Sequence, residues 1–240
     1  KASKSIGWGK FNNNGQTCIA TDYIYVHEAI KDKFVAEMTA SIKSLYGLGA
    51  DAGANGDYCR VVNASHHGRI TRLLDDAKAK GGVVLTGGEV TKKTQFIAPT
   101  LVEGMSDDSA IMQEEIFGPL LPIITYSDID EVISYINAKP KPLALYVYSK
   151  DNKLTDKVIR ETSAGDTCVN QTLMHFLHPN LPFGGVNNSG IGKSGGVWGF
   201  RAFTHERSVL VDKHSSLSMF YPPYTPGVRK VIKATMKMLT

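Results

Sequence analysis

Apolar residues follow two different spacings along the first two thirds of the chain. Short runs of β-branched and aromatic residues, such as residues 22–27 (DYIYVH), precede stretches in which apolar positions recur every three or four residues, as from Ile30 to Leu45. The first pattern predicts a strand and the second an amphipathic helix. Further strands are predicted at residues 83–86, 120–126, 143–148 and 165–170, and further helices at residues 70–77, 128–138 and 153–161. This alternation predicts an α/β fold, with a mostly parallel sheet and helices on both faces.

The last third of the chain loses this periodicity. Residues 179–199 mix glycine, proline, asparagine and serine too densely for a regular element, so we expect a long, shaped loop. Beyond it, Arg207–Val211 (RSVLV) predicts a strand that belongs to an arm, and the apolar spacing of residues 227–240 predicts a basic amphipathic helix. We therefore expect one large domain at residues 1–204 and an arm with a helical tail at residues 205–240.

Composition and charge narrow the class of protein. The chain has 240 residues, of which 42% are hydrophobic and 21% charged, which is typical of a globular domain and excludes a disordered or coiled-coil protein. The 27 Lys and Arg residues exceed the 23 Asp and Glu residues too little for a nucleic-acid surface, so we expect a small-molecule partner. Free cysteines, no apolar leader and no long apolar run predict a cytoplasmic protein without a stable membrane anchor.

Cys18 is the strongest candidate for chemistry. It lies in FNNNGQTCIA, after a glycine, among amide and hydroxyl side chains and just before a predicted strand. A thiol in that place can act as a nucleophile, because Gly15 permits a tight turn and nearby backbone N–H groups can face the oxyanion of an attacked carbonyl. A buried structural cysteine is the alternative interpretation, and it is the one that we favour for Cys59 and Cys168.

Other motif-like groups lack the context that their chemistry requires. The Gly192–Ser194 segment lacks the earlier glycine of a phosphate-binding loop, and the glycines around residues 83–86 do not open a helix as a dinucleotide-binding fingerprint does. The histidine pairs, His66–His67 and His175 with His178, have no further ligand at a metal-binding spacing. We therefore expect no metal site, while a cysteine–histidine hydrolase stays open as an alternative.

Three motifs together resemble the NAD(P)-dependent aldehyde dehydrogenases. FNNNGQTCIA is similar to the cysteine signature of that family, QEEIFGP to its second hallmark, and LPFGGVNNSGIG to its glycine-rich loop, in the family's order. The resemblance implies that Cys18 is the catalytic nucleophile. It also implies that Glu115 holds the nicotinamide ribose, that Phe117 contacts the nicotinamide, and that Phe183 lines the substrate cavity.

The same resemblance implies a reaction and an assembly. NAD or NADP would be the cofactor, and an aldehyde would become a carboxylate through a thiohemiacetal and a thioester on the cysteine. WGKFNNNGQTC and the YPP near the end look like the class 3 and fatty-aldehyde branch, which favours an apolar aldehyde of medium or long chain. Residues 1–204 would be the catalytic domain, and the strand in residues 205–240 would pair in a homodimer.

The resemblance covers only the C-terminal half of such an enzyme. The cofactor-binding half, the glutamate that activates water and the asparagine of the oxyanion hole belong to the part that these residues do not match. We therefore expect the 240-residue chain alone to be inactive or nearly so as a dehydrogenase. Two other classes stay open: a thiol esterase or acyl transferase that uses Cys18 without a cofactor, and a catalytically silent assembly module.

Overall fold

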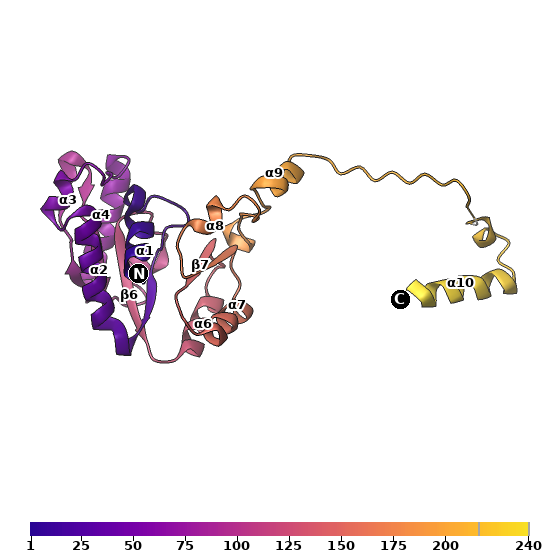
Figure 1. The fold of residues 1–240 in the computed structure, drawn as a ribbon, viewed down its shortest axis with the longest axis horizontal. Coiled ribbons are helices and arrows are strands. Elements are labelled where there is room, and N and C mark those ends of the chain that lie inside the picture. Colours follow the sequence, from indigo (N-terminus) through magenta and orange to yellow (C-terminus); the bar gives the residue numbers. More distant parts are fainter. Residues whose placement is uncertain (216, 240) are drawn as a thin grey trace. The chain divides into compact units, whose positions relative to one another are not determined.

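The largest sheet has four strands in the order β1-β6-β5-β2; Figure 1 labels one of them, β6. The computed structural model describes residues 1–215 and 217–239. β1 (Ile24–His27), β6 (Leu120–Tyr126) and β5 (Thr100–Glu103) are parallel neighbours, and β2 (Val83–Thr86) joins β5 antiparallel at one edge. The predicted α/β class with a mostly parallel sheet is confirmed.

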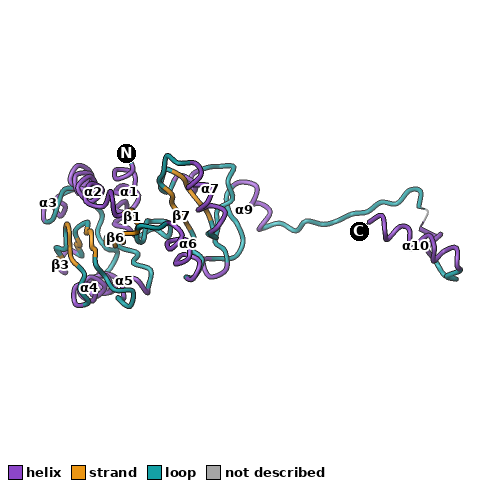
Figure 2. Tube along the Cα trace, turned by 90° about the horizontal axis from the view of Figure 1, so that it is seen from below, coloured by secondary structure: helices purple, strands orange, loops and turns teal. Residues whose placement is uncertain are grey.

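Helices cover both faces of this sheet, because successive side chains of a strand point to opposite faces. Leu101 and Ile123 belong to the core that includes side chains of α1 and α2, whereas Val102 and Leu120 belong to the core on the side of α4. The helices are α1 (Ala2–Phe11) and α2 (Lys31–Tyr46) on one face, and α4 (Ala64–Ala79) and α5 (Ala110–Gln113) on the other (Figure 2).

Side-chain caps determine where several helices begin. The Asn63 side chain accepts a hydrogen bond from the backbone N–H of His66, in the first turn of α4, at 2.9 Å. Asp128 caps α6 (Ile129–Ala138) and Asp151 caps α7 (Asn152–Glu161), each by accepting a backbone N–H at 2.8 Å. These bonds satisfy N–H groups that have no partner inside the helix. The predicted helices at residues 128–138 and 153–161 are thus confirmed, including the Asp cap of the first.

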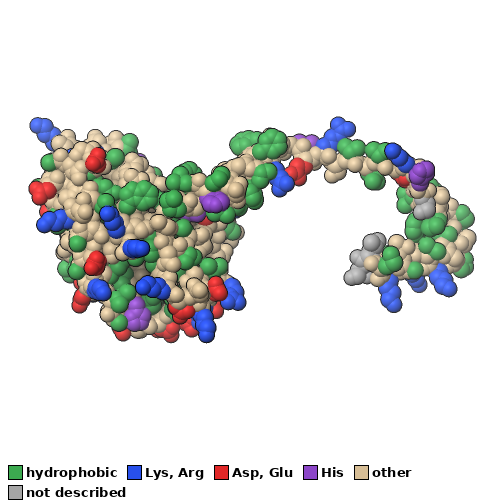
Figure 3. All heavy atoms as spheres, in the orientation of Figure 1, with side chains coloured by type: hydrophobic (Ala, Val, Ile, Leu, Met, Phe, Trp, Pro, Cys, Tyr) green, Lys and Arg blue, Asp and Glu red, His purple; other side chains and the backbone are tan. Residues whose placement is uncertain are grey.

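A second pair of parallel strands, β7 (Ala144–Val147) and β8 (Asp166–Val169), follows α6 and carries the glycine-rich loop. Its core is small, with Ile133, Val147 and Val158 as the buried members. Figure 3 shows hydrophobic side chains gathered at the surface near α9. The remaining short elements are α3 (Ala50–Ala54), β3 (Val90–Thr91), β4 (Phe96–Ile97), α8 (Met174–Leu177) and α9 (Gly196–Ala202).

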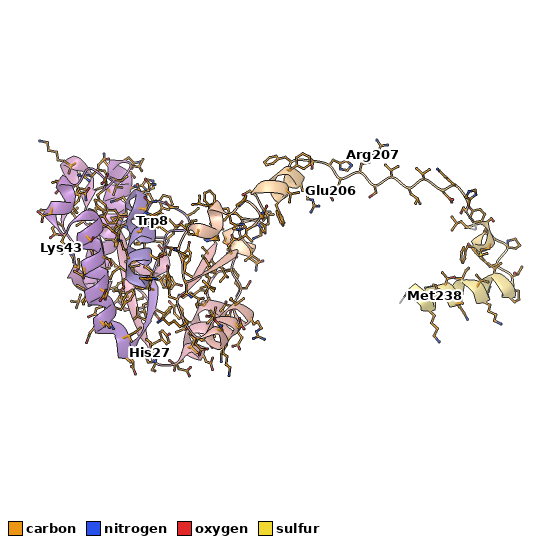
Figure 4. All side chains as sticks on the ribbon, viewed as in Figure 1. Trp8, His27, Lys43, Glu206, Arg207 and Met238 are labelled. Atoms are coloured by element: carbon orange, nitrogen blue, oxygen red, sulfur yellow. The ribbon has the colours of Figure 1, made fainter. Side chains whose placement is uncertain are left out.

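Thr204–Thr240 form a second compact unit, which follows the first, Lys1–Phe203, along the chain. The predicted tail helix is present as α10 (Pro226–Leu239). The predicted strand at Arg207–Val211 has no pairing partner within the described residues: the segment is extended, as Figure 4 shows, and Leu210 is 93% exposed, so its pairing with a second chain stays a prediction. A strand requires a hydrogen-bonded neighbour, and no described segment of the chain supplies one. The roles predicted for the two parts stay predictions.

Candidate functional site

The cysteine loop and the QEEIFGP segment each lead into one of two neighbouring parallel strands, β1 and β6. Because the starts of parallel strands lie at the same edge of a sheet, the fold brings the two segments together. Their backbones touch: a Cβ atom on Gly15 would lie 2.3 Å from the carbonyl oxygen of Gly118. Gly15 also has a φ of +73°, so glycine is required there for both space and backbone conformation.

The chain turns sharply just before Cys18. Residues 13–15 have φ values of 51°, 58° and 73°, a left-handed conformation that Asn and Gly tolerate better than other residues. Cys18 then occupies the second position of a turn in which the Ala20 N–H donates to the Thr17 carbonyl at 2.9 Å. Its thiol is free and exposed, which does not fit the interpretation of Cys18 as a buried structural cysteine.

The segment around Cys59 anchors this loop. Asn14 donates from its amide to the Cys59 carbonyl at 3.2 Å. The Gln16 amide donates to the Arg60 carbonyl at 3.0 Å and accepts the Val62 N–H at 2.9 Å. The amide residues of FNNNGQTC therefore hold the loop in place. Cys59 itself is exposed rather than buried.

Three charged groups interact next to the start of the QEEIFGP turn. Lys10 is 0% exposed, and its ammonium has no hydrogen-bond partner among the described residues. Burial lowers the pKa of Lys10 to about 8, while the charges of Asp22 and Glu115 oppose that shift. Burial also raises the pKa of Asp22, which accepts the Ile116 N–H at 3.0 Å. Desolvation and then the charge of Asp22 raise the pKa of Glu115.

The backbone that carries Glu115 and Phe117 is held from α4. Arg69 donates to the carbonyl of Glu115 at 3.0 Å and to that of Ile116 at 2.6 Å. Phe117 follows with a φ of +43° and a half-buried ring, an unfavourable conformation that folds retain mainly at functional sites. An exposed carboxylate that can accept from ribose hydroxyls, beside an apolar ring, fits a nicotinamide riboside.

Phe183 is connected to the cysteine loop through a row of aromatic rings. The Tyr146 hydroxyl donates to the carbonyl of Ile19, the residue after Cys18, at 2.7 Å. The rings of Tyr146 and His175 lie 5.7 Å apart, and those of His175 and Phe183 lie 6.0 Å apart. Burial raises the pKa of Tyr146, and the nearby thiols of Cys168 and Cys18 add to that shift. The fold thus brings the predicted nucleophile and the predicted cavity residue into one neighbourhood.

Side chains of the phosphate-loop-like segment and of the histidine pairs bond to the protein itself. Lys193 donates to the carbonyls of Gly165 and Gly184, so it holds the glycine-rich loop rather than facing solvent. His67 is buried with a ring nitrogen 3.2 Å from the Phe96 carbonyl, and His178 accepts the Asn180 N–H. Within the described ranges, no three His, Cys, Asp or Glu side chains are grouped to hold a metal ion, and no helix has the length and apolar character to cross a membrane.

The sequence does not predict four residues of this neighbourhood as site residues: Lys10, Asp22, Tyr146 and His175. One signal was available for the first, since a lysine directly before Phe11 interrupts an otherwise apolar and small stretch. Tyr146 lies between apolar residues on a predicted strand. This spacing indicates only that one face of the strand is more polar than the other. The sequence makes His175 a candidate for a metal ligand or a hydrolase residue, but its ring lies between those of Tyr146 and Phe183.

Comparison with known proteins matches this chain to one family. The profile of the aldehyde dehydrogenase family matches residues 1–209. The 4,4'-diaponeurosporen-aldehyde dehydrogenase of Staphylococcus aureus is 44% identical over 237 residues, which are 98% of this chain and 50% of that protein. The dimeric NADP-preferring aldehyde dehydrogenase of Mus musculus is 43% identical over 210 residues, 88% of this chain and 45% of that protein.

A solved structure gives the same result in three dimensions. The substrate-bound state of Staphylococcus aureus AldH superposes with a TM-score of 0.85 at 42% sequence identity. The superposition covers 98% of this chain and 50% of that chain. This chain therefore spans about half the length of the relatives that it matches.

Proposed function

This chain belongs to the aldehyde dehydrogenase family, whose members oxidise aldehydes with NAD or NADP, and we propose that residues 1–203 act as the catalytic part of such an enzyme. The observation that carries the proposal is the position of Cys18. Its exposed thiol lies on a turn held on one side by the Gly15–Gly118 contact and on the other by the Tyr146 bond to Ile19.

Cys18 is the nucleophile in this proposal. Its thiolate attacks the carbonyl carbon, so that a carbon–sulfur bond forms and an electron pair moves to the carbonyl oxygen, where the Cys18 backbone N–H donates a hydrogen bond. The cofactor, when bound, supplies the acceptor for the hydride that leaves this carbon. Water then cleaves the resulting thioester, which releases a carboxylate and restores the thiol.

Glu115 and Phe117 form the cofactor side of the proposed site. The Glu115 carboxylate would accept hydrogen bonds from the hydroxyl groups of the nicotinamide ribose, and the Phe117 ring would contact the nicotinamide. The support is geometric: Arg69 and Asp22 fix the backbone on either side of Ile116, so both side chains emerge from a rigid turn. The choice between NAD and NADP depends on residues that contact the adenosine, which we place outside these 240 residues.

Phe183 forms a wall of the aldehyde cavity. Its ring lies 5.0 Å from that of Phe176 and 6.0 Å from that of His175, so the wall is mainly aromatic. An aromatic wall stabilises apolar ligands by removing their surface from water. We therefore propose an apolar aldehyde of medium or long chain as the substrate.

Residues 207–211 are proposed as the contact with a second copy of the chain. Val209, Leu210 and Val211 are 68%, 93% and 71% exposed in an extended segment, which can gain backbone hydrogen bonds by adding to the edge of a partner's sheet. A mouse relative is described as dimeric. A cytoplasmic location is proposed from the three free cysteines.

The 240-residue chain by itself should oxidise aldehydes slowly or not at all. It spans about half the length of its relatives, and the residues that activate water and bind the remainder of the dinucleotide are proposed to lie in the other half. The catalytic test therefore uses the complete reading frame that encodes these residues. Aldehyde-dependent reduction of NAD(P) by the 240-residue chain alone would contradict this part of the proposal.

The test of the nucleophile compares Cys18→Ser with Cys59→Ser, since both thiols are exposed. In the complete protein, Cys18→Ser should lower kcat for aldehyde oxidation on the order of a thousandfold or more, while Cys59→Ser leaves it within about twofold. Aldehyde should also slow iodoacetamide labelling of Cys18 but not of Cys59. Equal losses in both variants would refute the assignment, and ester hydrolysis without cofactor that depends on Cys18 would favour a thiol esterase.

A further inference from the structure

Tyr146 joins the turn that carries Cys18 to the β7–β8 region through a single hydroxyl group. This hydroxyl donates to the Ile19 carbonyl at 2.7 Å and accepts the backbone N–H of Leu173 at 3.4 Å. Burial raises the pKa of Tyr146. The hydroxyl therefore keeps its proton, and remains a hydrogen-bond donor, at the pH values at which cysteine thiols ionise.

The bond from Tyr146 completes the anchoring of one peptide group in the cysteine turn. The N–H of this group, which belongs to Ala20, donates to the Thr17 carbonyl at 2.9 Å. Its carbonyl, which belongs to Ile19, accepts the Tyr146 hydroxyl. A peptide group is planar, so the two bonds together set the orientation of the whole unit. Because this unit follows Cys18 so closely, a rotation of it would change the direction in which the thiol points.

The chain on the other side of Cys18 is fixed by different partners. The Gln16 side chain donates to the Arg60 carbonyl at 3.0 Å and accepts the Val62 N–H at 2.9 Å. Cys18 thus lies between two anchored points, of which the second is supplied by a strand of another sheet. The position of the thiol therefore depends on the β7–β8 region as well as on its own loop.

The second partner of the hydroxyl also has a constrained backbone. Leu173 has a φ of +64° and is 8% exposed, a conformation that leucine rarely adopts. It directly precedes α8. Such a residue persists where its surroundings determine its conformation. The Tyr146 hydroxyl therefore holds two segments in specific conformations, which favours a role in alignment over simple filling of space.

We propose that Tyr146 is a positioning residue that aligns the Cys18 thiolate with the carbonyl carbon of the bound aldehyde. It acts through the Ile19 carbonyl and not on the substrate itself. Attack requires reacting atoms about 3–3.5 Å apart in the correct orientation, and a displacement of about 1 Å can lower the rate on the order of a hundredfold. This inference rests on the proposed function, because it assigns alignment to a nucleophile that must itself be Cys18.

The test compares Tyr146→Phe with Tyr148→Phe in the complete protein, with hexanal and benzaldehyde as substrates. Both changes remove one hydroxyl group from a partly buried side chain, and the two side chains are two positions apart in one extended segment. The Tyr148 hydroxyl bonds to the Ser5 hydroxyl of α1 at 2.8 Å, away from the cysteine turn. Tyr146→Phe should lower kcat on the order of ten- to a hundredfold while KM changes by less than about twofold. Tyr148→Phe should keep both constants within about twofold of the wild type.

Alkylation by iodoacetamide separates alignment from activation of the thiol. This small reagent does not require a bound aldehyde in one orientation, so Cys18 should be alkylated at a rate within about threefold of the wild type in both variants. Each kcat is expressed per folded protein, from the urea-denaturation curve of the same variant. A loss of alkylation as large as the loss of kcat would overturn the inference, because it would mean that Tyr146 controls the reactivity of the thiol instead.

The remaining outcomes distinguish this inference from the proposed function. If the wild type and both variants oxidise the aldehydes equally well, the inference fails and the proposed function survives. Equal losses of kcat in Tyr146→Phe and Tyr148→Phe would also overturn the inference, since the bond to Ile19 would then have no special role. If the wild type oxidises neither aldehyde, the proposed function fails and the inference fails with it.

Discussion

The two parallel-strand regions of residues 1–203 differ in how completely they bury their apolar side chains. In the four-stranded region, the core positions Leu101 and Ile70 are 0% exposed and helices cover both faces. In the β7–β8 region, the three core residues are 5–8% exposed, and Phe176 and Leu177 are 55% and 63% exposed. The first region can hold its shape by its own core, whereas the second leaves apolar surface for another partner to cover.

This difference separates the two tasks of the site. Cys18 and Glu115 belong to the well-buried region, where close backbone contacts and buried charges fix them. Phe183, the residue proposed for the substrate side, belongs to the other region, which is packed less completely. Reacting groups require precise placement, while a cavity wall can vary with the substrate. The comparison therefore predicts that the proposed nucleophile and cofactor residues are rigid and that the proposed substrate side is more adaptable.

The largest expected effect is the loss of the backbone contact in the well-buried region. Gly15→Ala introduces a Cβ 2.3 Å from the Gly118 oxygen at a φ of +73°, and should lower the free energy of unfolding by about 2–6 kcal/mol through strain and overpacking. Gly192 in the glycine-rich loop has a φ of +82°, but an added Cβ there would meet no atom within 4 Å. Gly192→Ala should therefore lower the free energy of unfolding by only about 1–3 kcal/mol. Urea denaturation measures both, and equal losses would show that the contact is unimportant.

A second experiment compares one leucine from each region. Leu101→Ala should lower the free energy of unfolding by about 2–5 kcal/mol, because it leaves a cavity at a fully buried position. Leu177→Ala should change it by less than about 0.5 kcal/mol, since this side chain is 63% exposed. Similar losses from both substitutions would remove the difference on which the comparison rests.

The same contrast explains what the sequence could predict. β6 (Leu120–Tyr126) was predicted with its observed bounds, because a strand buried on both faces is a continuous apolar run. The 207–211 strand was predicted from a shorter run, RSVLV, but pairing depends on a neighbour that local sequence does not specify. The motifs predict Cys18 as the nucleophile, whereas the hydrogen bond from the Ile116 N–H to the Asp22 carboxylate joins residues 94 positions apart. Such partners become visible only when the chain is folded.

A third prediction concerns the buried charge in the first region. The pKa of Lys10 is lowered from 10.5 to about 8 by burial, so between pH 8 and 10.5 the unfolded chain binds more protons at this residue than the folded chain. Stability should therefore rise with pH across this window, by up to about 3 kcal/mol. Lys10→Met should remove this rise in urea denaturation curves, and a rise of unchanged size would refute the assignment.

In the β7–β8 region, His175 should make the free energy of unfolding depend on pH in a lower pH range. Burial lowers the pKa of His175 below its usual value of 6.5, so the unfolded chain binds the proton more readily and stability should decrease as pH falls through that value. His175→Phe should make the free energy of unfolding less dependent on pH between about 5 and 7. A steeper dependence in the variant would mean that the ring is stabilised in its charged form.

The smallest expected effect is a gain in stability on the surface of the first region. Gly68 lies in α4 with an exposed position, and a Cβ there would meet nothing within 4 Å. Gly68→Ala should therefore raise the free energy of unfolding by about 0.5–1 kcal/mol, because alanine loses less backbone entropy in a helix. Gly199 in α9 is the matched position of the second region, where an added Cβ would have only ordinary contacts. We expect α9 to open before the core unfolds. Gly199→Ala should then raise the free energy of global unfolding less than Gly68→Ala does, because stabilising a segment that is already open leaves the remaining structure unaffected.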